Sequence, residues 1–154
     1  MPPESDVRQH PDRPIVGVGV VVWRGDSFLL VRRGKEPNKG QWSIPGGAQH
    51  LGETVYAAAE REVLEETGLQ VTVHGLVDVV DGIRRDSEGR VNYHYTLVDV
   101  VADSPSGEAR AADDAEAVGW FTLEDLPGLG LWSETERIIR ESVARRQSQS
   151  AVSQ

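Results

Sequence analysis

The chain contains no cysteine among its 154 residues. This absence excludes disulfide bonds, thiolate metal ligands and a cysteine nucleophile, and it is compatible with a reducing cytoplasm. No apolar run approaches the roughly 20 residues that a membrane-spanning helix needs, and Met1–Pro14 lacks the apolar stretch of a secretory signal. We therefore expect a cytoplasmic protein with no membrane partner.

Basic residues are scarce relative to acidic ones. The sequence has 16 Lys and Arg against 25 Asp and Glu, which gives a net charge of −9. Binding along a nucleic-acid backbone requires a basic surface, so we expect no nucleic-acid partner. A phosphate-bearing substrate would need a cation between itself and so acidic a protein.

The composition divides the chain into one domain and two terminal segments. Residues 1–13 are rich in proline and charge, and residues 142–154 end in Gln-Ser repeats. Both segments are predicted to be flexible tails. Residues 14–141 then form a single domain, which is long enough to bury a core.

The pattern within the domain combines strands with two helices. Runs of β-branched and apolar residues predict strands, the first two of which would form a hairpin: Ile15–Trp23, Ser27–Arg32, Gln41–Ile44, Val71–Val80, Val91–Val101 and Val118–Phe121. One helix is predicted over Thr54–Thr67, with Thr54 as its N-cap and Gly68 as its end. A second begins at Ser133 and ends near Arg146. This order indicates an α/β (α+β) sandwich, in which a mixed β-sheet packs between helices.

Acidic residues gather on one face of the helix predicted over Thr54–Thr67. At about 100° per residue, Glu62, Glu65 and Glu66 lie within an arc of about 100°. The opposite arc, predicted to pack against the sheet, carries Tyr56, Ala57, Val63 and Leu64. Like charges at these spacings repel, and a cation above them would remove the repulsion. Clustered oxygen ligands suit Mg²⁺ or Mn²⁺, ions that bridge phosphate oxygens and acidify a bound water.

The acidic helix belongs to a longer motif in Gly47–Leu69. Its pattern is Gly, five residues, Glu, seven residues, then Arg-Glu-apolar-any-Glu-Glu-any-Gly-apolar, which is the Nudix box. The matching residues are Gly47, Glu53, Arg61, Glu62, Val63, Glu65, Glu66, Gly68 and Leu69. At roughly 6% usage per residue type, chance supplies the seven fixed residues on the order of 10⁻⁹ times per starting point. The chain therefore resembles the Nudix hydrolase superfamily, and Asn92–Val101 and Ala112–Leu126 resemble its short bacterial ADP-ribose pyrophosphatase-like members.

The resemblance implies a Nudix-type sandwich and a role for each residue of the box. Glu62, Glu65 and Glu66 would hold one or more Mg²⁺ ions, with Mn²⁺ as the alternative, and the carbonyl of Gly47 would join them. Arg61 would form a supporting ion pair with Glu53, and a phosphate contact is its alternative role.

The general base is left open by the resemblance. It is either Glu62 or an acid of the downstream loop, which offers Asp113, Asp114 and Glu116. Asp114 lies six residues before Trp120, where similar members place a metal-binding acid.

The reaction that the resemblance implies is hydrolysis of a pyrophosphate bond. A metal-activated water attacks one phosphorus in line, a carboxylate takes its proton, and the cation stabilises the leaving phosphate. The predicted substrate is a small molecule, a nucleoside diphosphate linked to another moiety, such as ADP-ribose. Candidates to stack on its base are Trp23, Trp42, Tyr93, Trp120 and Trp132, and candidates to hold its phosphate or ribose are Arg32, Arg33, Arg84 and Arg85.

Other functions stay open at this point. Arg85 stands where many ADP-ribose pyrophosphatases carry a proline, which leaves (deoxy)nucleoside triphosphates, oxidised ones included, as an alternative substrate class. A non-catalytic nucleotide-binding sensor is the alternative of another class, although such modules typically break the box. An isomerase on the same fold is disfavoured because it uses a cysteine. A homodimer is expected by analogy.

Overall fold

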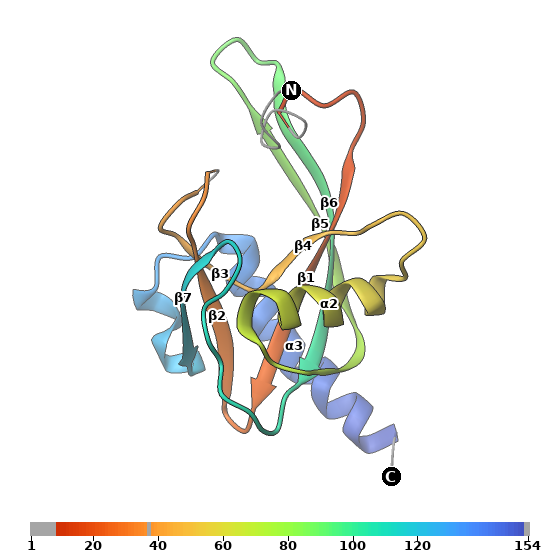
Figure 1. Ribbon diagram of the computed structural model, residues 1–154, viewed down its shortest axis with the longest axis vertical. Helices are drawn as coiled ribbons and strands as arrows, with labels where there is room; N and C mark the ends of the chain where they lie inside the picture. Colours follow the sequence, from red (N-terminus) through yellow and green to blue (C-terminus); the bar gives the residue numbers. More distant parts are fainter. Residues whose placement is uncertain (1–8, 37, 153–154) are drawn as a thin grey trace.

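The structure is a computed structural model that describes residues 9–36 and 38–152, with the side chains of 147–152 excepted. Its strands are β1 (Ile15–Arg24), β2 (Ser27–Arg33), β3 (Trp42–Ser43), β4 (Gly46–Ala48), β5 (Thr72–Arg85), β6 (Val91–Asp103) and β7 (Ala115–Phe121). Its helices are α2 (Val55–Thr67), the 3-10 helix η1 (Leu123–Gly128) and α3 (Ser133–Val152). Figure 1 shows their order along the chain.

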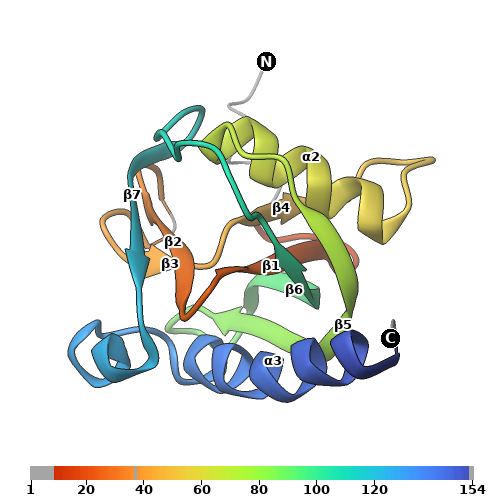
Figure 2. The same ribbon diagram turned by 90° about the horizontal axis from the view of Figure 1, so that it is seen from below.

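The strands form one mixed sheet that lies between the two long helices. The sheet has the order β3-β2-β1-β6-β5, and β4 pairs in addition with β1 and β7 with β2. In Figure 2, α2 lies on one side of the strands and α3 on the other. The predicted fold class, a mixed sheet packed between helices, is therefore confirmed.

Strand β1 is the centre of this sheet rather than one arm of a hairpin. It pairs in parallel with β6 from Ile15 to Trp23, and its contact with β2 is confined to Trp23↔Phe28 and Arg24↔Ser27. Beyond this tip β2 pairs with β3 and β7. The predicted hairpin is therefore wrong for most of its length. The reason is that β1 is buried on both faces, which suits a central strand with parallel partners.

The two faces of β1 contribute to separate hydrophobic clusters. Val18, Val20 and Val22 pack with Ala58, Ala59 and Val63 of α2, among others. Val21 and Trp23 pack with Ile138 and Ile139 of α3, among others. Because successive side chains of a strand point to opposite faces, one strand anchors both helices.

Helix α2 has the predicted ends. The Thr54 hydroxyl accepts a hydrogen bond from the Ala57 amide at 3.0 Å. Gly68 follows the helix with φ 76°, a left-handed conformation that glycine adopts without strain, and its amide donates to the Leu64 carbonyl.

The face of α2 that packs on the sheet differs from the predicted one. Tyr56, Ala57 and Leu64 are exposed, whereas the buried residues are Ala58, Ala59, Glu62, Val63 and Thr67. The small alanine side chains let the helix approach the strands closely, and Glu62 and Glu66 lie within this inner face. The prediction failed because it assigned the carboxylates to solvent, where such groups usually lie.

The C-terminal helix continues beyond its predicted end. The flexible tail predicted from Ser142 is wrong at its start, because α3 reaches Val152 and Ser142 is fully buried. The buried Trp23 indole N–H donates to the Ser142 hydroxyl at 2.9 Å, and the Arg146 guanidinium donates to Asp103 at 3.1 Å. These contacts hold the helix on the domain. Most of the other predicted tail, residues 1–8, lies outside the described residues.

No helix within the described part of the chain is both long and apolar enough to cross a membrane.

Candidate functional site

The acidic face of α2 lies against the glycine strand β4. A Cβ atom added at Gly47 would lie 2.5–2.7 Å from the carboxylate atoms of Glu62 and would displace that carboxylate. One added at Gly46 would overlap the Val18 carbonyl oxygen. Gly46 is therefore required by the backbone of β1, and Gly47 is what leaves the Glu62 carboxylate in its place beside β4.

Glu62 and Glu66 share a confined space beside this strand. Glu62 is 8% exposed, and Glu66 accepts a hydrogen bond from the Gly46 amide at 3.3 Å. Burial, together with the neighbouring Glu62 carboxylate, raises the pKa of Glu66 to about 8. Two carboxylates in one confined space repel, and a divalent cation relieves that repulsion. These hard oxygen donors therefore fit Mg²⁺ or Mn²⁺.

Arg61 connects the helix to the loop before it. Its guanidinium forms a two-point ion pair with Glu53, at 2.6 and 3.0 Å, as predicted. It also contacts Glu62 at 2.8 Å, Glu65 at 3.1 Å and the Ala48 carbonyl at 3.1 Å. The Arg61 hydrogen bonds, aided by the His50 amide, lower the pKa of Glu53 to about 2. Arg61 thus holds the acidic residues in position.

Glu65, the third predicted metal ligand, lies outside the confined pair. Its side chain is exposed and forms an ion pair with Arg61. Among the residues that the structure describes, no three acidic or histidine side chains converge closely enough to hold a metal ion. The ligand set of Gly47, Glu62, Glu65 and Glu66 therefore stays a prediction, in which Glu62 and Glu66 are the members brought together.

Asp114 lies immediately before β7, next to the loop that follows β2. Its carboxylate forms an exposed ion pair with Lys35 at 2.9 Å, and its carbonyl accepts from the Gly34 amide at 2.8 Å. Glu116 pairs with Arg32 at 2.6 Å. The hydrogen bonds and ion pairs of the described residues include none between these acids and the carboxylates of α2, so the role of Asp114 as a base or ligand stays a prediction.

A cleft of about 580 Å³ lies against strand β4, whose glycines contact the carboxylate pair. Its wall includes Gly17–Gly19 of β1 and Gly46–Ala48 of β4. Of these residues, Gly46 bonds to Glu66 and Gly47 contacts Glu62. Clefts of roughly 300–1,000 Å³ are typical of small-molecule sites, and a nucleotide fits this range.

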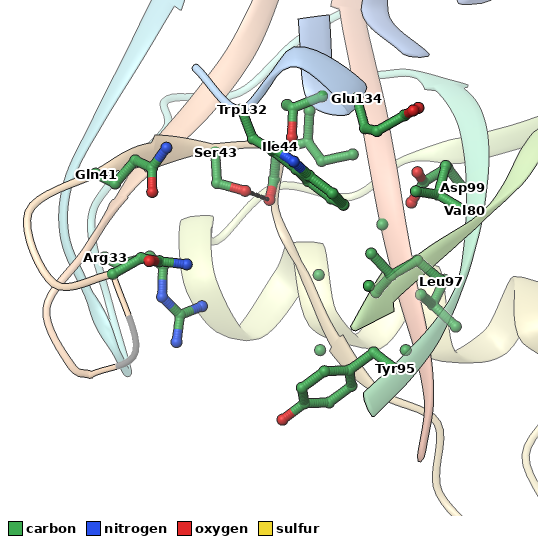
Figure 3. A pocket seen from close by; sticks show the side chains of 18 of the residues that line it. Arg33, Gln41, Ser43, Ile44, Val80, Tyr95, Leu97, Asp99, Trp132 and Glu134 are labelled. Atoms are coloured by element: carbon green, nitrogen blue, oxygen red, sulfur yellow. Dashed lines mark hydrogen bonds between the residues drawn. The ribbon is translucent and has the colours of Figure 1, made fainter. Parts of the chain in front are cut away.

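Aromatic and charged side chains line the cleft (Figure 3). The aromatic ones are Trp42, Tyr93, Tyr95 and Trp132, the basic ones Arg33 and Arg84, and the acidic ones Asp99 and Glu134. Of the stacking candidates, Trp23 lies in the core instead, and Trp120 lies beneath the Arg24 guanidinium at 4.5 Å. Of the arginine candidates, Arg32 pairs with Glu116, and Arg85 donates to the Gly89 carbonyl.

Asp99 is the cleft residue that sequence reasoning missed. It lies in the middle of β6, is 6% exposed, and has no charged residue beside it in the apolar run Leu97–Val101. Burial raises its pKa to about 6. A single acid inside an apolar strand is the signal that could have identified it, since aspartate is almost never fully buried without a partner.

Comparisons with known proteins show which proteins the chain resembles. The family model described as the NUDIX domain matches residues 13–142. The chain is 37% identical to an ADP-ribose pyrophosphatase of Methanocaldococcus jannaschii, over 83% of this chain and 72% of that protein. It is 34% identical to a putative 8-oxo-dGTP diphosphatase 2 of Mycobacterium tuberculosis, over 89% and 92%. A MutT NUDIX hydrolase from Burkholderia pseudomallei has a similar crystal structure, with a TM-score of 0.73, 34% identity and coverage of 84% and 98%.

Proposed function

The chain belongs to the Nudix hydrolase family, and from that premise we propose that it cleaves the pyrophosphate bond of a nucleoside diphosphate linked to another moiety, ADP-ribose or a close analogue. One observation carries the proposal. The glycines that contact the confined Glu62–Glu66 pair also form the wall of a nucleotide-sized cleft. A substrate in the cleft would thus have its phosphates next to the carboxylates.

The family generally uses divalent metal ions, and we propose Mg²⁺, with Mn²⁺ as the alternative. Glu62, Glu65, Glu66 and the Gly47 carbonyl would hold the ion, which when bound neutralises phosphate charge and acidifies water. Arg61 orients Glu62 and Glu65 through the hydrogen bonds described above.

The remaining roles in the proposed reaction fall to residues around the cleft. Glu62 accepts the proton of the attacking water, with Asp114 as the alternative base. Arg33 and Arg84, which line the cleft, carry the positive charge that phosphate and ribose oxygens need. The exposed ring of Trp132 offers a stacking surface for the base.

A (deoxy)nucleoside triphosphate is the second candidate substrate, oxidised nucleotides included. The relative named as a putative 8-oxo-dGTP diphosphatase supports it, because that similarity covers nearly the whole of both chains. The cleft volume accommodates either substrate class.

A substrate panel distinguishes these candidates. The purified protein is incubated with Mg²⁺ and ADP-ribose, NADH, diadenosine polyphosphates, nucleotide sugars, nucleoside triphosphates or 8-oxo-dGTP, and the products are separated by chromatography. AMP with ribose 5-phosphate supports the first proposal, whereas a nucleoside monophosphate with pyrophosphate supports the second. Binding of a nucleotide without any cleavage, by a folded protein with bound metal, would overturn both in favour of a sensor.

A further inference from the structure

Asp99 is a buried carboxylate that the proposed reaction does not use. It lies on β6 opposite Gly19 of β1 and lines the cleft. Gly19 is one residue along β1 from Val18, which pairs with Gly47. Within the described part of the chain, no ion pair includes Asp99, and its hydrogen bond is with the backbone of Gly19. A Cβ at Gly19 would overlap the Asp99 Oδ1 atom, so this glycine is what leaves room for the carboxylate.

Arg137 of α3 compensates the charge of Asp99 only in part, because its hydrogen bonds go to other acids. Arg137 of α3 lowers the pKa of Asp99, though less than burial raises it. Its guanidinium bonds to Glu134 at 2.6 Å, and to Asp78 and Glu141 at 3.0 Å each. Of the two acids that line the cleft, Glu134 is thus paired with a guanidinium and Asp99 is not.

The surroundings of Asp99 fit a flat heterocycle that offers N–H groups. Figure 3 shows the Asp99 carboxylate turned into the cleft, on the side where the ring of Trp132 lies. Trp132 is 42% exposed, and Ile44 and Leu97 supply apolar surface nearby. An ionised carboxylate only accepts hydrogen bonds, so a ligand that satisfies it must present a donor there.

We propose that Asp99 determines the base specificity of the cleft, by accepting a hydrogen bond from the exocyclic amino group of a base that stacks on Trp132. This inference rests on the proposed function, since it assumes that a nucleotide occupies the cleft. Adenine and guanine each carry an exocyclic amino group, whereas hypoxanthine carries none. A hypoxanthine nucleotide therefore leaves the buried carboxylate without that donor. An unpaired buried polar group lowers the binding affinity strongly.

Binding of nucleoside monophosphates tests this inference without any need for hydrolysis. The affinities of AMP, GMP and IMP are measured by calorimetry at pH 8, where the Asp99 carboxylate is ionised. The variants are Asp99→Asn and, as the matched control, Asp81→Asn, which removes one charge from an exposed position on β5. We expect the wild-type protein and the control to prefer AMP or GMP over IMP by roughly tenfold to a hundredfold.

The Asp99→Asn variant is expected to lose this preference, because an amide offers an acceptor to an amino group and a donor to a carbonyl. If Asp99 had a merely structural role, the substitution would lower the affinities for all three nucleotides equally and leave their ratios unchanged. That result would overturn the inference. Equal affinities in the wild-type protein would overturn it too. A preference that depends on Asp99, in a protein that cleaves nothing in the substrate panel, would support the base recognition while refuting the proposed hydrolysis.

Discussion

Replacing Asp99 by asparagine should change how stability depends on pH. The carboxyl has an ordinary pKa of 3.8, and burial raises it to about 6 in the folded protein. Between these values the folded state binds more protons than the unfolded state, so ionisation of Asp99 makes stability fall as the pH rises. The asparagine side chain does not titrate, and the variant lacks this decrease.

The size of the effect follows from the two pKa values. They are about two apart, and each pKa unit corresponds to about 1.4 kcal/mol. The full titration of Asp99 therefore lowers the free energy of unfolding by about 3 kcal/mol, of which roughly 2.5 kcal/mol falls between pH 4 and pH 7. The free energy of unfolding of the variant, relative to that of the wild-type protein, should therefore rise by roughly 2.5 kcal/mol between pH 4 and pH 7. Other titrating groups, such as Glu53 with its lowered pKa, are common to both proteins and cancel in the difference.

Urea unfolding at pH 4, 5, 6 and 7 measures this difference directly. The control Asp81→Asn removes one charge from an exposed position of the neighbouring strand β5, and the effect of Asp99→Asn is compared with it at each pH. The reasoning is refuted if the Asp99→Asn difference is flat across the series, or if the variant becomes relatively less stable as the pH rises. Either result would mean that Asp99 is well solvated or paired in solution.

Three further substitutions test other contacts. Gly47→Ala should lower Mg²⁺ affinity and hydrolysis at least about tenfold, since its Cβ would displace the Glu62 carboxylate. The control is Gly128→Ala, at a position with open space, and equal activities of the two variants would contradict the role of Gly47. Arg61→Lys should cost about 1–3 kcal/mol in urea unfolding, because lysine cannot reproduce the two-point pair with Glu53; the exposed Arg110→Lys should change little, and similar values for both would refute the role of Arg61. Ser142→Ala should cost about 1–3 kcal/mol by leaving the Trp23 indole N–H unpaired, whereas the exposed Ser87→Ala should be neutral; an equally stable Ser142→Ala would place the end of α3 off the domain.

Local chemistry made the ends of α2 predictable, whereas long-range contacts did not follow from the sequence. Thr54 and Gly68 act on backbone groups within four residues of themselves, so their effect is visible in the sequence. The partner of β1 is instead β6, some 80 residues away. An apolar run is compatible with either partner. The contact of Ser142 with Trp23 spans 119 residues, and the polar composition around Ser142 gives no sign of it.

The same distinction applies to the candidate site. The motif spacing placed Glu62 and Glu66 on one helix face, and the structure brings these two together beside Gly47. That this face is turned inward could not be predicted, because burial of carboxylates is unusual. Asp99 was missed for a related reason. The cleft that it lines is assembled from β1, β6 and the start of α3, which are distant in the chain.

Hydrolysis of ADP-ribose across a Mg²⁺ titration tests the central claim most directly. The proteins compared are the wild type, Glu62→Gln, Glu66→Gln and the control Glu60→Gln, which changes an exposed residue of the same helix by the same charge. The account predicts hydrolysis that requires the metal, falls at least about a hundredfold in Glu62→Gln and Glu66→Gln, and persists in Glu60→Gln. Hydrolysis in the presence of a chelator, or full activity in both Glu62→Gln and Glu66→Gln, would contradict it.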